Sequence, residues 1–353
     1  MDYVLPQQKQ KVIERTFILG AGFSRAIRGI ESPLRKELFE KLSIPFDIRD
    51  KYHTDDIEMF MTDLDRDIKR YKDDNSPEAG SYMELKIKIK NQVVQIFRNL
   101  ADPNKYNNDV ATKFGELLKE NDIIITFNYD TFLEQFLCEI HKIWSPFGGY
   151  TPIVTCELPA NHVPKNDEMK NIIILKPHGS INFLEAQVIG TEDDIWIGLE
   201  ITEDIFPSLH CNFNYGLGRG QPALILPTYL QQEFPRQLNA LWHLASEFVK
   251  KAQKIVIIGY SLPEEDGKTN DLFSYIEPHP DIETREVLII NGKEESSITK
   301  VRIEKLAWFN PRSKKISVKP LGYLEEEIDK LPEILSGRRP KGEKKAVINM
   351  SRC

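Results

Sequence analysis

The sequence predicts an α/β fold with a doubly wound, mostly parallel sheet, and three observations lead to this prediction. Short apolar runs rich in β-branched residues recur along the 353-residue chain. These runs are continuous and do not alternate with polar residues, which is typical of strands buried on both faces of a parallel sheet. Helical patterns separate the runs, and alternating strands and helices indicate a Rossmann-like α/β architecture.

Seven segments are predicted to be strands. In chain order they are RTFIL (15–19), DIIITF (122–127), NIIIL (171–175), ALIL (223–226), KIVIIG (254–259), EVLIIN (286–291) and KKISV (314–318). A helix is predicted over residues 238–252, because the apolar residues there recur at spacings of three and four. A second helical pattern spans residues 82–100, although LKIKIK within it also fits a strand.

The spacing of the predicted strands is uneven. About a hundred residues separate the first two strands, which is far more than one crossover helix needs. We therefore predict a helical insertion over about residues 31–120, which forms a small second domain within a catalytic domain of residues 1–335. Residues 141–170 and 203–222 are rich in Pro, Gly and Asn and are predicted to be long loops. Residues 336–353 are basic and poor in core-forming side chains, so we expect a flexible tail.

The composition excludes several classes of function. With 41% hydrophobic and 29% charged residues, it is typical of a soluble globular protein. The formal net charge of −7 argues against a surface that coats nucleic acid, so we expect no direct nucleic-acid binding. No apolar run is long enough to cross a bilayer, and the N-terminal segment lacks the apolar core of a secretory signal. We therefore expect a cytoplasmic protein that binds no membrane.

The cysteines predict neither a metal site nor a disulfide framework. The four cysteines are widely scattered, no CxxC pair occurs, and no histidine pair has the spacing of a metal site. We expect free thiols in a reducing compartment, and no zinc. These cysteines are Cys138, Cys156, Cys211 and Cys353.

The first predicted strand ends in the sequence GAGFSR. Gly20 and Gly22 permit a sharp turn and a close approach of the backbone to a ligand, and Ser24 is placed to cap the helix that follows. The N-terminus of that helix would then face a phosphate. The third glycine of the dinucleotide fingerprint is replaced by Arg25, so a tight turn without a ligand is an equally good interpretation.

Two further strands end in polar clusters. Asn128 and Asp130 follow the second strand, where a ligand binds in open α/β sheets, although both residue types also cap helices and form turns. His178 follows the third strand beside a glycine, and an imidazole with a pKa of about 6.5 is suited to general-base catalysis. A lone histidine is more often structural, but the other six histidines have no comparable setting.

The later strands complete the set. Gly259 and Ser261 end one strand, Asn291 ends another, and the ALILPTY segment adds Thr228 and Tyr229. Several such clusters on one edge of one sheet are best explained by a crevice large enough for a dinucleotide.

In order and type, these motifs resemble those of the sirtuin family, the NAD-consuming proteins of the silent-information-regulator type. GAGFS, NYD, HGS, GYSL and IIN occur in the family's order and span about residues 15–295. The resemblance implies that Asn128 orients the nicotinamide ribose, that Asp130 lies near the nicotinamide pocket, and that His178 is the catalytic base. It also implies an NAD-binding set, which is Gly20, Ala21, Gly22, Phe23, Ser24, Asp130, Gly259, Ser261 and Asn291.

The departures from the family pattern narrow the implied activity. The zinc-binding cysteine pairs of protein-deacylating sirtuins are missing, and Phe127 stands where they have glutamine. Their Asp-Phe-Arg loop has no clear counterpart, because SPLRKELF occupies that place. In these respects the chain is similar to bacterial sirtuin-like proteins that hydrolyse NAD in anti-phage defence.

That similarity implies an NAD hydrolase that releases nicotinamide and ADP-ribose. His178 would take a proton from water or from a ribose hydroxyl, while Asn128 fixes the water and the ribose. It also implies a homo-oligomer, a regulatory partner such as a helicase-like ATPase or an Argonaute-type protein, or both. Two alternatives stay open: an NAD-dependent protein deacylase or ADP-ribosyltransferase, and a non-catalytic sensor of NAD or ADP-ribose.

Overall fold

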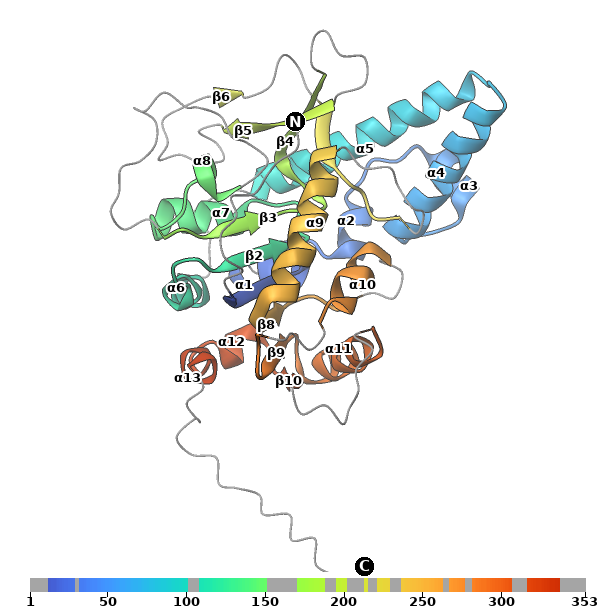
Figure 1. Ribbon diagram of the computed structural model, residues 1–353. Helices are drawn as coiled ribbons and strands as arrows, with labels where there is room; N and C mark the ends of the chain where they lie inside the picture. The colour runs from blue at the N-terminus through green and yellow to red at the C-terminus, as the bar shows by residue number, and fades with distance from the viewer. Residues whose placement is uncertain are drawn as a thin grey trace, which may run out of the picture.

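Six parallel strands form the centre of the molecule in the computed structural model. The model describes residues 12–28, 32–100, 108–150, 170–187, 195–201, 213–214, 221–228, 236–262, 267–276, 281–306 and 316–336. The strands are β1 (Ile13–Leu19), β2 (Ile123–Thr126), β3 (Ile173–Leu175), β8 (Ala252–Ile258), β9 (Arg285–Ile290) and β10 (Ile316–Leu321). Their order in the sheet is β10-β9-β8-β1-β2-β3, which confirms the predicted doubly wound, Rossmann-like architecture (Figure 1).

The strand order places a topological switch point between β1 and β8. From β1 the chain moves outward to β2 and β3, and it then returns to β8 on the other side of β1. Connections on the two sides of this point leave the sheet in opposite directions, so that a crevice opens at the carboxyl ends of β1 and β8. The fold therefore provides a ligand site at the end of the GAGFS and GYSL strands.

The ALIL segment is a strand, but it lies in a different sheet from the one predicted. β4 (Gly179–Gln187), β5 (Ile195–Ile201), β6 (Phe213–Asn214) and β7 (Gln221–Leu224) form a second sheet in the order β6-β5-β4-β7. The backbone turns from β3 into β4 at Gly179, whose φ is +81°, and β4 then pairs with β7 antiparallel. The ALIL segment thus joins β4 and contributes no strand end to the parallel sheet.

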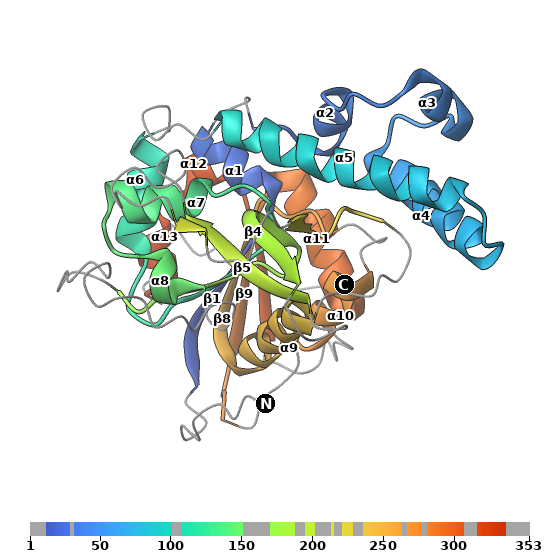
Figure 2. The same ribbon diagram turned by 90° about the horizontal axis from the view of Figure 1, so that it is seen from above.

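Helices cover both faces of the parallel sheet. α9 (Arg236–Lys251) and α10 (Gly267–Ser274) lie on one face, and α1 (Ala21–Arg28), α6 (Asn108–Leu117) and α12 (Leu324–Glu327) lie on the other (Figure 2). The remaining helices are α7 (Phe132–Gln135), which continues as a π-helical turn over Phe136–Ile140, α8 (Pro146–Gly149), α11 (Lys293–Leu306) and α13 (Leu331–Leu335). None of the described helices is long and apolar enough to cross a membrane.

The predicted insertion is helical. It contains α2 (Arg35–Glu40), α3 (Phe46–Tyr52), α4 (Ile57–Asp73) and α5 (Glu78–Leu100), and LKIKIK lies inside α5. α4 and the adjoining part of α5 project from the body of the molecule, while α5 also contacts β4 and β7 (Figure 2). The buried side chains of the insertion belong to the same hydrophobic core as those of the sheet. That the insertion is a separate domain stays a prediction.

Two predicted loops and the predicted tail lie largely outside the described residues. Within 141–170, α8 is described and residues 151–169 are not. Within 203–222, the described residues form β6 and the start of β7. Residues 337–353 of the predicted tail are likewise outside the described part of the chain.

Three glycines hold the two halves of the sheet together at the switch point. Gly22 N donates to Gly259 O at 2.9 Å, and Gly20 N donates to Ile258 O at 3.0 Å. A Cβ atom on Gly20 would lie 2.6 Å from Gly259 O, and one on Gly22 would lie 2.7 Å from Gly259 Cα. Backbone packing between the ends of β1 and β8 therefore requires glycine here, apart from any contact with a ligand.

We predict that Gly259→Ala destabilises the protein. Gly259 has a φ of +61°, and a Cβ atom there would lie 2.2 Å from Phe23 N. The left-handed backbone alone costs about 1–2 kcal/mol in a residue with a side chain, and the clash adds to that cost. Urea unfolding should therefore show a loss of at least about 1 kcal/mol in the free energy of unfolding.

Gly80→Ala is the matched control. Gly80 lies in α5, and no atom lies within 4 Å of its added Cβ. This variant should gain roughly 0.5–1 kcal/mol, because alanine favours the helix. Equal free energies of unfolding for the two variants would contradict the packing role of Gly259.

Candidate functional site

A chain of buried hydrogen bonds joins the end of β2 to α1. Asn128 Nδ2 donates to Ser24 Oγ at 2.8 Å and to Gly20 O at 2.9 Å, and Ser24 Oγ donates to Asp130 Oδ2 at 2.8 Å. Both protons of the Asn128 amide nitrogen are thus used. Asn128 Oδ1 accepts no hydrogen bond from the described residues, so it is the atom of this side chain that can bind a ligand.

Ser24 does not cap α1, and that prediction is wrong. α1 begins at Ala21, so Ser24 lies inside the helix and its hydroxyl points toward Asp130. The sequence GAGFS therefore forms no loop between strand and helix. Its serine couples α1 to the turn after β2.

Asp130 is buried beside this chain and is stabilised from several directions. Its Oδ1 accepts from Phe132 N at 3.2 Å at the start of α7. Asp130 therefore stabilises the turn, as expected, and also lies beside the candidate site. Burial raises the pKa of Asp130 to about 6, although the nearby charge of Lys176 acts in the opposite direction. At neutral pH the side chain is mainly an anion at the cavity described below.

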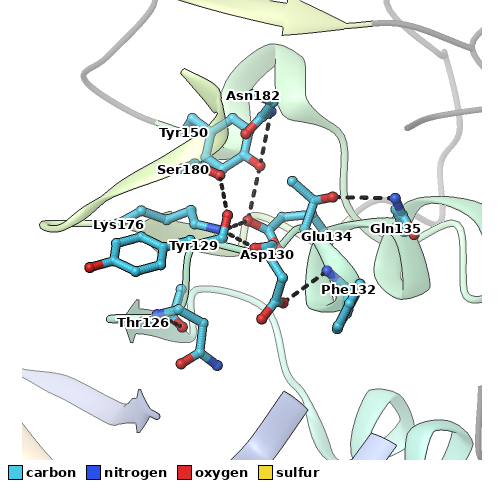
Figure 3. Close-up of polar contacts among 12 residues, drawn as sticks. Thr126, Tyr129, Asp130, Phe132, Glu134, Gln135, Tyr150, Lys176, Ser180 and Asn182 are labelled. Carbon is cyan, nitrogen blue, oxygen red and sulfur yellow. Dashed lines mark hydrogen bonds and ion pairs between the residues drawn. The ribbon is translucent and has the colours of Figure 1, made fainter. Parts of the chain in front are cut away.

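A buried ion pair supports the turn that carries Asn128 and Asp130. Lys176 Nζ donates to Glu134 Oε1 at 2.7 Å and also to Asp130 O, and both side chains are almost fully buried. Tyr150 OH donates to the same Glu134 oxygen at 3.0 Å. Figure 3 shows Lys176 and Tyr150 converging on Glu134. Sequence reasoning missed Glu134 and Tyr150, and the only available signal was a lysine that directly follows a buried strand.

A cavity of about 140 Å³ opens beside Asn128 and Asp130. Its lining is mostly apolar and comes from both the sheet edge and the helical insertion. The lining residues are Ala21, Ser32, Pro33, Leu38, Ile57, Phe97, Phe127, Asn128, Tyr129, Asp130 and Pro227. Apolar walls with a few convergent polar groups are typical of a site for a small planar ligand. The contribution of the insertion to this wall was not predicted.

His178 lies next to the cavity but does not line it. Its backbone oxygen accepts from Ile225 N at 2.9 Å, which fixes the chain between β3 and β4. Its ring lies 5.1 Å from the ring of Phe127 and 5.5 Å from that of Trp242, measured between centroids. Phe127 lines the cavity, so its ring contacts both the cavity and the imidazole of the predicted base.

The other predicted NAD-binding residues lie along the same edge of the sheet. Gly259 and Asn291 directly follow β8 and β9, and Ser261 is exposed, with its backbone oxygen accepting from Arg302 Nη1 at 3.0 Å. Ala21 is exposed and lines the cavity. The side chain of Phe23 instead packs in the core against Phe114, so only its backbone could meet a ligand.

In the ALILPTY segment, Thr228 contacts the helical insertion. Thr228 Oγ1 lies 3.1 Å from Thr62 Oγ1 of α4, and Tyr229 is outside the described residues. No group of three or more histidine, cysteine or acidic residues suited to a metal occurs in the described part of the chain. Cys138 is buried and forms no disulfide bond with a described residue, and the other three cysteines are not described. The expected lack of zinc stays a prediction.

We predict that Asp130→Asn changes how stability depends on pH. Because the folded-state pKa is raised to about 6, the folded protein binds a proton that the unfolded chain releases near pH 4. Asp130 therefore loses stabilising free energy as the pH rises from about 4 to about 7, by roughly 2 kcal/mol. Asparagine has no carboxyl group to ionise, so the variant does not lose this free energy. Its free energy of unfolding relative to that of wild type should therefore rise as the pH goes from about 4 to about 7.

Urea unfolding of both proteins at several pH values measures this difference. Glu14→Gln, at an exposed carboxyl in β1, serves as the control for exchanging a carboxylate for its amide, and it should not show the rise expected of Asp130→Asn. A constant difference between wild type and Asp130→Asn from pH 4 to pH 7 would contradict the raised pKa of Asp130.

Comparison with known proteins agrees with this geometry. A model of the SIR2-like domain family matches residues 122–300, which is half of the chain. The matched region contains Asn128, Asp130, His178, Gly259 and Asn291, and it begins after the GAGFS turn and the insertion. No curated protein matches the chain. The resemblance inferred from the motifs is confirmed, and the chain belongs to the SIR2-like, or sirtuin-like, family, whose chemistry depends on NAD.

Proposed function

We propose that the protein is an NAD hydrolase, which cleaves the bond between nicotinamide and ribose and releases nicotinamide and ADP-ribose. One observation carries the proposal. The side-chain amide of Asn128 is held by Ser24 and Gly20 at an apolar cavity. The neighbouring residue, Phe127, also lines this cavity, and its ring contacts His178. The site thus combines a pocket for a flat ring, a fixed polar group and an imidazole. Membership of an NAD-dependent family supports NAD as the substrate.

The switch point accommodates the rest of the dinucleotide. α1 begins at Ala21, one residue after β1, so the N-terminal end of this helix lies at the crevice between β1 and β8, although Gly20 N and Gly22 N are already bonded to the backbone of Ile258 and Gly259. A helix N-terminus attracts the negative charge of a diphosphate. We assign the diphosphate to the start of α1 at Ala21, where Gly20, Gly22 and Gly259 leave space because they carry no side chains, and the adenosine ribose to Asn291.

The reaction needs a nucleophile more than it needs an acid. When the glycosidic bond breaks, its electron pair moves to the ring nitrogen of the cationic nicotinamide, which leaves as a neutral molecule. Positive charge develops on the ribose, as it does in glycoside hydrolysis. A site that orients the ribose, stabilises this charge and activates one water molecule is therefore sufficient.

Each of three side chains has a separate task. Asn128 Oδ1 accepts a hydrogen bond from a ribose hydroxyl or from the attacking water, since its Nδ2 protons are already bonded within the protein. The buried carboxylate of Asp130 stabilises positive charge on the nicotinamide ring and the ribose. His178 takes the proton of the water as its oxygen bonds to the ribose carbon.

We further propose that the activity depletes NAD in anti-phage defence and is held in check by an oligomeric interface or by a regulatory partner. The partner classes expected from the family are helicase-like ATPases and Argonaute-type proteins. The insertion is suited to transmit such control, because Leu38, Ile57 and Phe97 supply one wall of the cavity. Nicotinamide release measured with the isolated chain and with the products of neighbouring genes tests this part of the proposal.

We predict that His178→Ala lowers the rate of nicotinamide release by about 10²- to 10⁴-fold, the usual contribution of a general base. The fold should be retained, because the hydrogen bond that Ile225 N donates to His178 O does not involve the His178 side chain. Chromatography of NAD reactions measures the rate, and thermal unfolding checks the fold.

His243→Ala is the matched control, because His243 is exposed on α9. Its rate should equal that of wild type. If the two alanine variants cleave NAD at the same rate, His178 is not the base; if wild type never releases nicotinamide, with or without partners, the protein is not an NAD hydrolase.

A further inference from the structure

Two aromatic rings flank the imidazole of His178. The ring centroids of Phe127, His178 and Trp242 form a triangle with separations of 5.1, 5.5 and 5.8 Å. Aromatic rings at these distances are in direct contact, so no other group fits between them. Phe127 directly follows β2, and Trp242 lies in the middle of α9.

The two flanking rings are held firmly in place. Phe127 and Trp242 are each only 7% exposed. Tyr260, which follows β8, contacts Phe127 at 4.9 Å, and Phe273 of α10 stacks on Tyr260 at 6.2 Å. Trp242 Nε1 is buried and has no hydrogen-bond partner among the described residues, while Lys268 Nζ lies over the Trp242 ring at 5.9 Å from its centroid. Displacing either ring would expose apolar surface or break several contacts at once.

We propose that Trp242, together with Phe127, selects water as the molecule that His178 activates. The rings leave access to the imidazole for a small hydroxyl compound and exclude larger nucleophiles, such as an alcohol with an alkyl chain or a peptide side chain. Trp242 is thus a specificity-determining residue. This inference rests on the proposed hydrolase function and deepens it by naming the acceptor.

The selected and the excluded reactions differ only in the acceptor. With water, the glycosidic bond breaks, its electron pair leaves on nicotinamide, the water oxygen bonds to the ribose carbon, and the proton passes to His178. With an alcohol, the same bonds break, the alcohol oxygen bonds to the ribose carbon, and the hydroxyl proton passes to His178. The products are then nicotinamide and an alkyl glycoside of ADP-ribose.

The product ratio in the presence of 1-propanol tests the proposal. NAD is incubated with wild type, Trp242→Ala, Trp242→Leu and Trp242→Phe, and nicotinamide, ADP-ribose and propyl ADP-ribose are separated by chromatography with mass detection. We expect ADP-ribose to dominate for wild type and for Trp242→Phe, which keeps a ring. The propyl share should rise roughly tenfold or more in Trp242→Ala, the scale on which pockets discriminate by size. Trp242→Leu gives the same result by a milder truncation if the alanine variant folds poorly.

Val249→Ala controls for loosening of α9 in general. Val249 is fully buried near the C-terminal end of the same helix, about two turns from Trp242, so its truncation should leave the propyl share at the wild-type value. The proposal is overturned if wild type forms the propyl glycoside as readily as Trp242→Ala, or if the truncated variants still form ADP-ribose alone. Absence of nicotinamide from every wild-type reaction would instead overturn the hydrolase function, and the acceptor selection with it.

Discussion

The hydrogen bonds from Asn128 to Ser24 and from Ser24 to Asp130 fix the geometry on which the rest of the site depends. They join α1 to the turn after β2, and the second proton of Asn128 Nδ2 adds Gly20 to the same unit. Lys176 holds that turn from β3, where it pairs with Glu134. Because buried polar groups are costly unless they are bonded, this network favours one arrangement of the three strand ends.

The network lies where the two halves of the sheet meet. Gly20 and Gly22 pack so closely against Gly259 that side chains there would clash. The crevice at the switch point therefore lies where backbone hydrogen bonds join the ends of β1 and β8. The insertion contributes Leu38 and Ile57 to the wall of the cavity beside Asn128 and Asp130. The site therefore has fixed polar groups at the strand ends and an apolar wall from the insertion. This arrangement suits the proposed binding of a dinucleotide at its cleavable bond and the proposed control of activity through the insertion.

Local patterns predicted the parallel sheet well, since continuous apolar runs such as IIIT of β2 are buried on both faces. Local patterns did not predict the features that depend on contacts between residues far apart in the sequence. The positive φ of Gly179 starts an antiparallel sheet that takes the ALIL segment, and the early start of α1 moves Ser24 from a cap into the Asp130 network. Tyr150, the wall residue Phe97 and the ring of Trp242 come from segments that no motif connects with the strand ends, and Glu134 follows the NYD motif closely but has its partner Lys176 42 residues away. Their roles depend on tertiary packing, which a single sequence does not encode as a short pattern.

The central claim is that the cavity beside Asn128 holds the nicotinamide of NAD for cleavage. A crystal structure of the His178→Ala variant, which we expect to react slowly, in complex with NAD tests it most directly, because it requires no turnover and no activating partner. The account predicts the nicotinamide ring inside the cavity, with Asn128 Oδ1 bonded to the ribose and the diphosphate at the start of α1. Nicotinamide bound outside the cavity, or a diphosphate away from the ends of β1 and β8, would contradict the account.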